Sequence, residues 1–193
     1  MRLVYVRDSR AKGYTVLGID SGDGARAYTV ETALYMRIGS PLPSDEIDDG
    51  DFADVAFADE VFRATKKALS LLTYSDNNKK TLFMKLKKAG FSADAAKSAV
   101  QDMMRLGYIN EERQLERLII AEAKLKLQGR RKFIPKLVAK GYERALVDSV
   151  LEKLLESGEI DFDIIAEELV AKKLGDDPDP EAVRILLYKN GLA

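Results

Sequence analysis

Two stretches of the sequence decide the fold: KLKKAGFSADAAKSAVQDMMRLGYI at residues 85–109 and KLVAKGYERALVDSVLEKLLESGEI at residues 136–160. They align without a gap at an offset of 51 residues, and the alignment pairs Gly90 with Gly141. Self-similarity at a fixed period is typical of proteins built from tandem structural repeats. We therefore predict that the chain repeats one structural unit.

Each matched stretch contains the pattern of an amphipathic helix. Apolar side chains recur at positions i, i+3, i+4, i+7 and i+8, which places them on one helix face. These residues are Ala96, Ala99, Val100, Met103 and Met104 in the first stretch and Val147, Val150, Leu151, Leu154 and Leu155 in the second. Gly90 and Gly141 precede the stripes and can adopt the left-handed conformation that ends a helix. We predict three helices in each repeat, at residues 59–72, 78–89 and 92–106 and at residues 112–128, 132–140 and 143–156.

The residues before the repeats follow a different pattern. Candidate strands at residues 3–6, 14–19 and 26–30 are separated by glycine-containing turns, which predicts a small antiparallel sheet. A short helix is expected at residues 31–38. The acidic residues 45–60 are expected to form a solvated linker that leads into the first repeat.

A third repeat begins at Ile164 and reaches Gly191, which occupies the place of Gly141, so its closing helix is expected to be absent. The predicted fold class is mainly α: tandem three-helix repeats form an elongated curved stack, and a small antiparallel β-sheet domain precedes them. The predicted domains are residues 1–57, 58–110, 111–160 and 161–193.

Cysteine, histidine and tryptophan are absent, which restricts the chemistry available to the chain. Disulfides and thiolate metal sites cannot form, and the usual general base near neutral pH is missing. The segment DEIDDGDFADVA is comparable with a calcium loop, but Ile47 and Ala56 occupy two ligand positions. We therefore predict a protein without catalytic activity, cofactor or metal. An enzyme that uses the carboxylates of residues 45–54 with a divalent metal is a less favoured alternative.

The formal net charge of −1 hides an uneven distribution. Residues 1–61 carry 6 basic and 12 acidic side chains, residues 62–160 carry 21 and 12, and residues 161–193 carry 4 and 8. The basic centre favours an anionic partner, although ordinary solvated helix faces are an alternative reading. No stretch approaches the roughly 20 apolar residues that cross a bilayer. We expect a cytoplasmic monomer that does not bind membranes.

The order and duplication of short motifs from residue 78 onward resemble those of the RecX family of recombination regulators. The first block comprises Asn78, Leu82, Lys85-Leu86, Ala89-Gly90-Phe91, Gly107-Tyr108-Ile109 and residues 110–114, and the second comprises residues 129–132, Ile134, Leu137 and Lys140-Gly141-Tyr142. The strands followed by AYTVETALYMRIGSPL also look like the β-rich extension of longer family members. Three features depart from the family pattern: Asn78 replaces a serine or threonine, Ala89 replaces a basic residue, and the third repeat lacks its closing helix.

The resemblance implies a regulator that binds the RecA recombinase filament and mostly inhibits its strand exchange and ATP hydrolysis, in recombination, DNA repair and the SOS response. Catalysis would then belong to the partner. An alternative is a helical-repeat protein that binds single- or double-stranded DNA directly, without sequence specificity. The predicted partner-binding residues are Arg113, Arg117, Lys124, Arg130, Arg131, Lys132 and Lys136.

Overall fold

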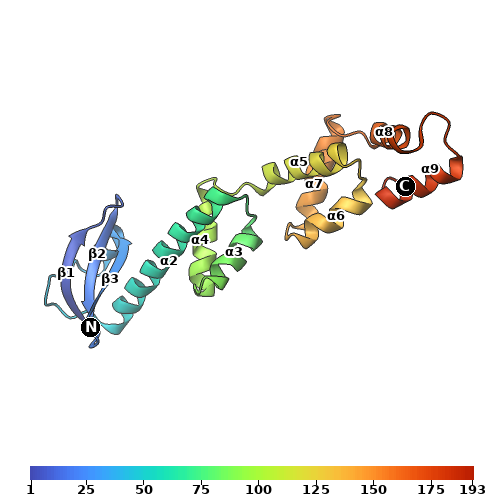
Figure 1. Cartoon of the computed structure of the whole chain (residues 1–193). Helices are drawn as coiled ribbons and strands as arrows, with labels where there is room; N and C mark the ends of the chain where they lie inside the picture. Colours follow the sequence, from blue (N-terminus) through green and yellow to red (C-terminus); the bar gives the residue numbers. More distant parts are fainter. The chain divides into compact units, whose positions relative to one another are not determined.

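The computed structural model describes residues 1–193 and is mainly helical, with a small sheet at the amino-terminal end (Figure 1). This agrees with the predicted class of helical repeats after a β-rich extension. The chain divides into two compact units. The first unit comprises Met1–Ser75 and Leu82–Tyr108, and the second unit comprises Asp76–Thr81 and Ile109–Ala193.

The sheet of the first unit contains three antiparallel strands in the order β1-β2-β3. These are β1 (Arg2–Asp8), β2 (Tyr14–Asp20) and β3 (Ala25–Glu31), close to the predicted strands. The Asp20 carboxylate closes the second turn, because its Oδ1 accepts hydrogen bonds from the backbone N–H groups of Gly22 and Gly24 at 2.9 and 3.1 Å. The short helix α1 (Thr32–Arg37) follows β3.

Helix α2 (Asp49–Tyr74) begins ten residues before the predicted position. Asp48 caps it, since its Oδ1 accepts a hydrogen bond from the Asp51 N–H at 2.8 Å. Acidic side chains in the first turn also complement the helix dipole. Val55 is fully buried and packs in a cluster with the sheet. The acidic residues expected as a linker therefore form the first turns of a helix.

The remaining helices follow the predicted repeats. They are α3 (Lys79–Lys88), α4 (Ala93–Arg105), α5 (Glu111–Ile120), α6 (Arg130–Ala139) and α7 (Arg144–Glu156). Helix α5 continues into a π-helical turn, η1 (Ala121–Leu125). Gly90 and Gly141 have φ values of 95° and 103°, as expected of residues that end a helix in the left-handed conformation.

The apolar stripes lie in the cores of the two units, with one exception. In α7, Val147, Val150, Leu151 and Leu154 are buried against Phe133 and other residues of the second unit. In α4 the equivalent residues are buried, but Met104 at the end of the stripe is 43% exposed. Met104 was therefore wrongly expected in the core.

The third repeat contains two helices, α8 (Phe162–Leu174) and α9 (Pro180–Asn190), and Gly191 ends α9 with a φ of 75°. Ile165 and Leu169 of α8 belong to the core of the second unit, so this repeat shares a core with the preceding one. None of the helices is both long enough and apolar enough to cross a bilayer.

Candidate partner interface

The predicted partner-binding residues lie on three consecutive elements of the second unit. Arg113 and Arg117 are on α5, Lys124 is on η1, and the remaining four are on α6 (Figure 1). Their side-chain contacts divide them into two groups. All of them except Lys132 are exposed; one group makes an exposed ion pair or none, and the other contacts the third repeat or the buried Glu122.

Arg113, Arg117 and Lys124 form the first group, which we call the exposed cations. The Arg113 side chain is exposed and has no ion pair. Arg117 pairs with Asp76 at 2.7 Å and Lys124 pairs with Glu159 at 2.5 Å, and all four of these side chains are between 44% and 71% exposed. Exposed ion pairs contribute only about 0–1 kcal/mol, so an incoming acidic group can replace the internal partner at small cost.

Arg130, Arg131 and Lys132 form most of the second group and hold the third repeat. The Arg130 guanidinium lies 5.3 Å from the centre of the Phe162 ring. Arg131 donates a hydrogen bond to the carbonyl oxygen of Ala193 at 2.6 Å, and Lys132 donates one to Asn190 Oδ1 at 3.2 Å. The most concentrated basic cluster of the sequence therefore contacts the third repeat of the same chain.

Lys136 forms hydrogen bonds with residues in and just after the π-helical turn. Its Nζ donates hydrogen bonds to Gln128 Oε1 at 2.6 Å and to Glu122 Oε2 at 3.2 Å. Burial alone would raise the pKa of Glu122, but hydrogen bonds from Lys126 and Lys136 outweigh it and hold this pKa below its ordinary value. Glu122 is therefore ionised at neutral pH and keeps both lysines close to η1.

The loop before α3 makes polar contacts within the second unit that the sequence did not reveal. Asn78 caps α3, since its Oδ1 accepts from the Thr81 N–H at 2.7 Å, while its Nδ2 donates to the Lys140 carbonyl at 2.9 Å. The buried Glu111 carboxylate accepts from the Lys79 N–H at 2.9 Å. The preference of asparagine for the N-cap position could have indicated the first contact, whereas no local signal indicates the others.

A buried hydrogen-bonded chain continues this arrangement. The Tyr142 hydroxyl donates to Gln114 Oε1 at 3.0 Å, and Gln114 Nε2 donates to the Asn77 carbonyl at 3.3 Å. Burial raises the pKa of Tyr142, and the nearby carboxylates of Glu111 and Asp76 raise it further, so this hydroxyl stays protonated. A hollow of about 730 Å³ opens beside this chain and is lined by residues that include Arg117 and Lys140.

Comparison with known proteins gives a consistent result. No family model matches the chain. A regulatory protein RecX from Caldanaerobacter subterraneus subsp. tengcongensis is 27% identical over 169 residues, which cover 88% of this chain and 84% of that protein. A crystal structure of a regulatory protein RecX superposes with a TM-score of 0.70 at 15% identity, covering 97% of this chain and 91% of the other. For RecX from Lactobacillus salivarius the TM-score is 0.56 at 19% identity, covering 70% of this chain and 90% of the other.

Proposed function

The chain is a member of the RecX family of regulatory proteins, and on that premise we propose that it binds the RecA recombinase filament and restrains strand exchange and ATP hydrolysis. The observation that carries the proposal is the match to a RecX protein over most of both chains. In this role the chain acts as a cytoplasmic monomer without catalytic activity of its own. Its effect on ATP hydrolysis is then exerted through the filament.

Within the second unit, the exposed cations are the residues we assign to first contact with the filament. Arg113 has no internal ion pair, and Arg117 and Lys124 hold exposed partners. Cationic side chains of this kind steer association with an acidic surface and can form new ion pairs at small cost. Arg130, Arg131, Lys132 and Lys136 are then assigned a double role, in which they hold the fold and add positive potential.

The decisive experiment is a RecA ATPase and strand-exchange assay titrated with the protein. Inhibition at a substoichiometric ratio to RecA supports filament binding over simple competition for DNA. Charge reversal of the exposed cations (Arg113→Glu, Arg117→Glu and Lys124→Glu) is expected to raise the half-inhibiting concentration about tenfold or more. The matched control reverses three exposed lysines of the third repeat: Lys172→Glu, Lys173→Glu and Lys189→Glu.

The control variant is expected to inhibit within about twofold of the wild type, because its charges lie outside the assigned surface. Unchanged inhibition by the variant of the exposed cations would remove these residues from the interface. No inhibition by the wild-type protein at any ratio would remove the function itself.

Direct binding of DNA is the second candidate, because residues 62–160 carry 21 basic against 12 acidic side chains. If about five phosphates are neutralised on duplex DNA, log affinity falls with log salt at a slope near −4.5. Such a slope in the absence of RecA, together with inhibition that excess DNA abolishes, would favour this candidate. No DNA binding at low salt would eliminate it.

A further inference from the structure

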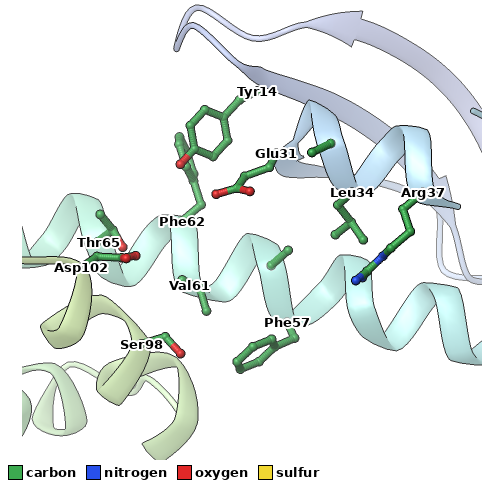
Figure 2. Close-up of a pocket in the computed structure, with 12 residues that line it drawn as sticks. Tyr14, Glu31, Leu34, Arg37, Phe57, Val61, Phe62, Thr65, Ser98 and Asp102 are labelled. Atoms are coloured by element: carbon green, nitrogen blue, oxygen red, sulfur yellow. The ribbon is translucent and has the colours of Figure 1, made fainter. Parts of the chain in front are cut away.

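A hollow of about 390 Å³ lies in the first unit, where α1, α2 and α4 meet the end of the sheet. Figure 2 shows its lining side chains converging from these elements. None of the exposed cations belongs to this unit. The hollow is therefore a separate feature of the molecule.

The middle of the hollow is apolar. Leu34 comes from α1, and Phe57 and Val61 come from α2. Phe57 is 43% exposed, an uncommon state for a phenylalanine that flanks a recess. Large exposed apolar side chains around a recess are typical of binding sites, because covering them with an apolar group removes their surface from water.

Arg37, which pairs with Asp54 at 2.9 Å, lines one side of the hollow, and the end away from it is acidic (Figure 2). Tyr14, Glu31, Thr65 and Asp102 lie there together (Figure 2). The Glu31 carboxylate is exposed and has no ion pair, and Asp102 pairs only with the exposed Arg105 of its own helix, at 2.9 Å. Burial raises the pKa of the Tyr14 hydroxyl, and the carboxylates of Glu31 and Asp102 raise it further, as expected where the potential is negative.

A second hollow, of about 660 Å³, shares Tyr14, Phe62 and Thr65 with the first but has a different set of charged side chains. The rings of Tyr14 and Phe62 pack with their centres 4.8 Å apart. Its charged lining residues are predominantly basic, with Arg7, Arg10 and Lys66 against the single carboxylate of Asp8. An anionic ligand would therefore favour the second hollow, and a cationic one the first.

We propose that the first hollow binds a short peptide segment of a partner protein in which an apolar side chain is followed by a lysine or arginine. The apolar side chain contacts Phe57 and Val61, and the cation lies between Glu31 and Asp102 beside the Tyr14 hydroxyl. Nucleic acid does not fit this site, because its phosphates would meet two carboxylates. The proposal does not rest on binding of the RecA filament.

The test is an amide NMR titration of the full chain with the probe N-acetyl-phenylalanyl-arginine amide. For a ligand of this size we expect a dissociation constant between about 0.1 and 2 mM, with saturable shifts confined to the residues that line the hollow. The matched probes replace arginine with glutamine or with glutamate. We expect binding about threefold to tenfold weaker with glutamine and no saturable shifts at this hollow with glutamate.

Two variants complete the test. In Glu31→Gln/Asp102→Asn we expect the arginine probe to bind as weakly as the glutamine probe, because the carboxylates that distinguish them are gone. The control variant Asp163→Asn/Glu167→Gln removes two charges from the second unit and is expected to bind the arginine probe like the wild type. The spectrum of each variant reports whether it is folded.

Absence of saturable shifts in the wild type would overturn the proposal, as would equal affinity for the arginine and glutamine probes. Shifts that persist unchanged in Glu31→Gln/Asp102→Asn would place the probe elsewhere. Inhibition of RecA by the same variant reports on the proposed function separately, since the exposed cations remain intact in it.

Discussion

The loops that precede α3 and α6 make equivalent contacts within the second unit, 51 residues apart in the sequence. In this alignment Gly129 is equivalent to Asn78, and Arg130 is equivalent to Lys79. In the first docking contact, residues 76–81 lie on α5 and on the turn after α6, and Asn78 donates to the Lys140 carbonyl. In the second docking contact, residues 127–132 lie on α8 and on the turn after α9, and the Gly129 N–H donates to the Asn190 carbonyl at 2.8 Å.

Both loops donate a hydrogen bond to a backbone carbonyl, but the side chains that receive them differ in chemistry. Glu111, Gln114 and Tyr142 receive the first loop through hydrogen bonds and an ion pair. Their counterparts in the third repeat are Phe162 and Ile165, 51 residues later, and Leu192, 50 residues later, and all three belong to or pack against the apolar core. Lys79 thus meets a carboxylate, whereas Arg130 meets an aromatic ring.

The same backbone arrangement therefore accepts either polar or apolar side chains at the contact. The polar version relies on buried groups that must find partners, while the apolar version relies on close approach of two backbones. We expect the first docking contact to respond to salt and pH and the second to respond to changes of volume. The predictions below test that division.

The largest effect is expected from Gly129→Ala, because a Cβ there would lie 1.9 Å from the Gly191 carbonyl oxygen and 2.6 Å from the Leu192 nitrogen. Both neighbours are backbone atoms, so the clash cannot be relieved by a rotamer change. We expect a loss of about 2–4 kcal/mol in unfolding free energy, with reduced hydrogen-exchange protection in α9. Denaturant unfolding followed by exchange measurements checks this.

Gly50→Ala is the matched control, since a Cβ at this helical position would meet only the Asp48 Oδ1 atom at 3.3 Å. It is expected to stabilise the protein by about 0.5–1 kcal/mol, through the better helix propensity of alanine. Equal stability of Gly129→Ala and the wild type would show that the second docking contact is loose.

Truncation at one pair of equivalent positions compares the two contacts directly. Phe162→Ala removes a ring whose centre lies 6.3 Å from that of Phe133, and we expect a loss of about 2–3 kcal/mol. Glu111→Ala leaves the Lys79 N–H without its acceptor, and we expect a loss of about 1–2 kcal/mol. Denaturant unfolding measures the loss of unfolding free energy in both variants. A larger loss for Glu111→Ala would mean that the first docking contact contributes more to stability than the second.

Salt is expected to have a smaller effect and to act on the first docking contact. Raising sodium chloride from about 50 mM to about 1 M should lower the hydrogen-exchange protection of residues 79–81 about twofold to fivefold, because it screens the ion pairs of Lys79 and Arg117. Protection around Gly129 should not fall. A loss of protection at both contacts would contradict the division between polar and apolar docking.

The smallest effect is expected from the pH response of Glu143. A hydrogen bond from Lys79 Nζ, at 2.6 Å, and the charge of that ammonium hold the pKa of Glu143 below its ordinary value. The ionised carboxylate therefore favours the folded state above its unfolded pKa, and this contribution is lost as pH falls through the folded pKa. An NMR titration of the Glu143 carboxyl measures this pKa.

Lys79→Met should move the titration midpoint of Glu143 upward, because the hydrogen bond and the charge are both removed. Arg130→Met changes the equivalent residue of the second docking contact and should leave the midpoint where it is. An unchanged midpoint in Lys79→Met would mean that the two side chains are not paired in solution.

Much of the fold could be predicted from the sequence because it depends on local patterns. The stripes around Val100 and Val150, the glycines at 90 and 141 and the turns between the strands each reflect neighbouring residues alone. Their periodicity and permitted φ values determine helices, helix ends and hairpins before any distant contact forms. Local sequence patterns are therefore sufficient to predict the repeat and its helices and strands.

The contacts of individual side chains depend on how the helices pack in three dimensions. Arg131 and Lys132 donate hydrogen bonds to residues about 60 positions away, and Gly129, at the start of α6, lies against the backbone of Gly191 and Leu192. Met104 follows the core pattern but lies at the exposed end of its stripe. The residues next to a charged side chain or a glycine in the sequence do not indicate which distant residue it will contact. That contact depends on how the repeats pack against each other.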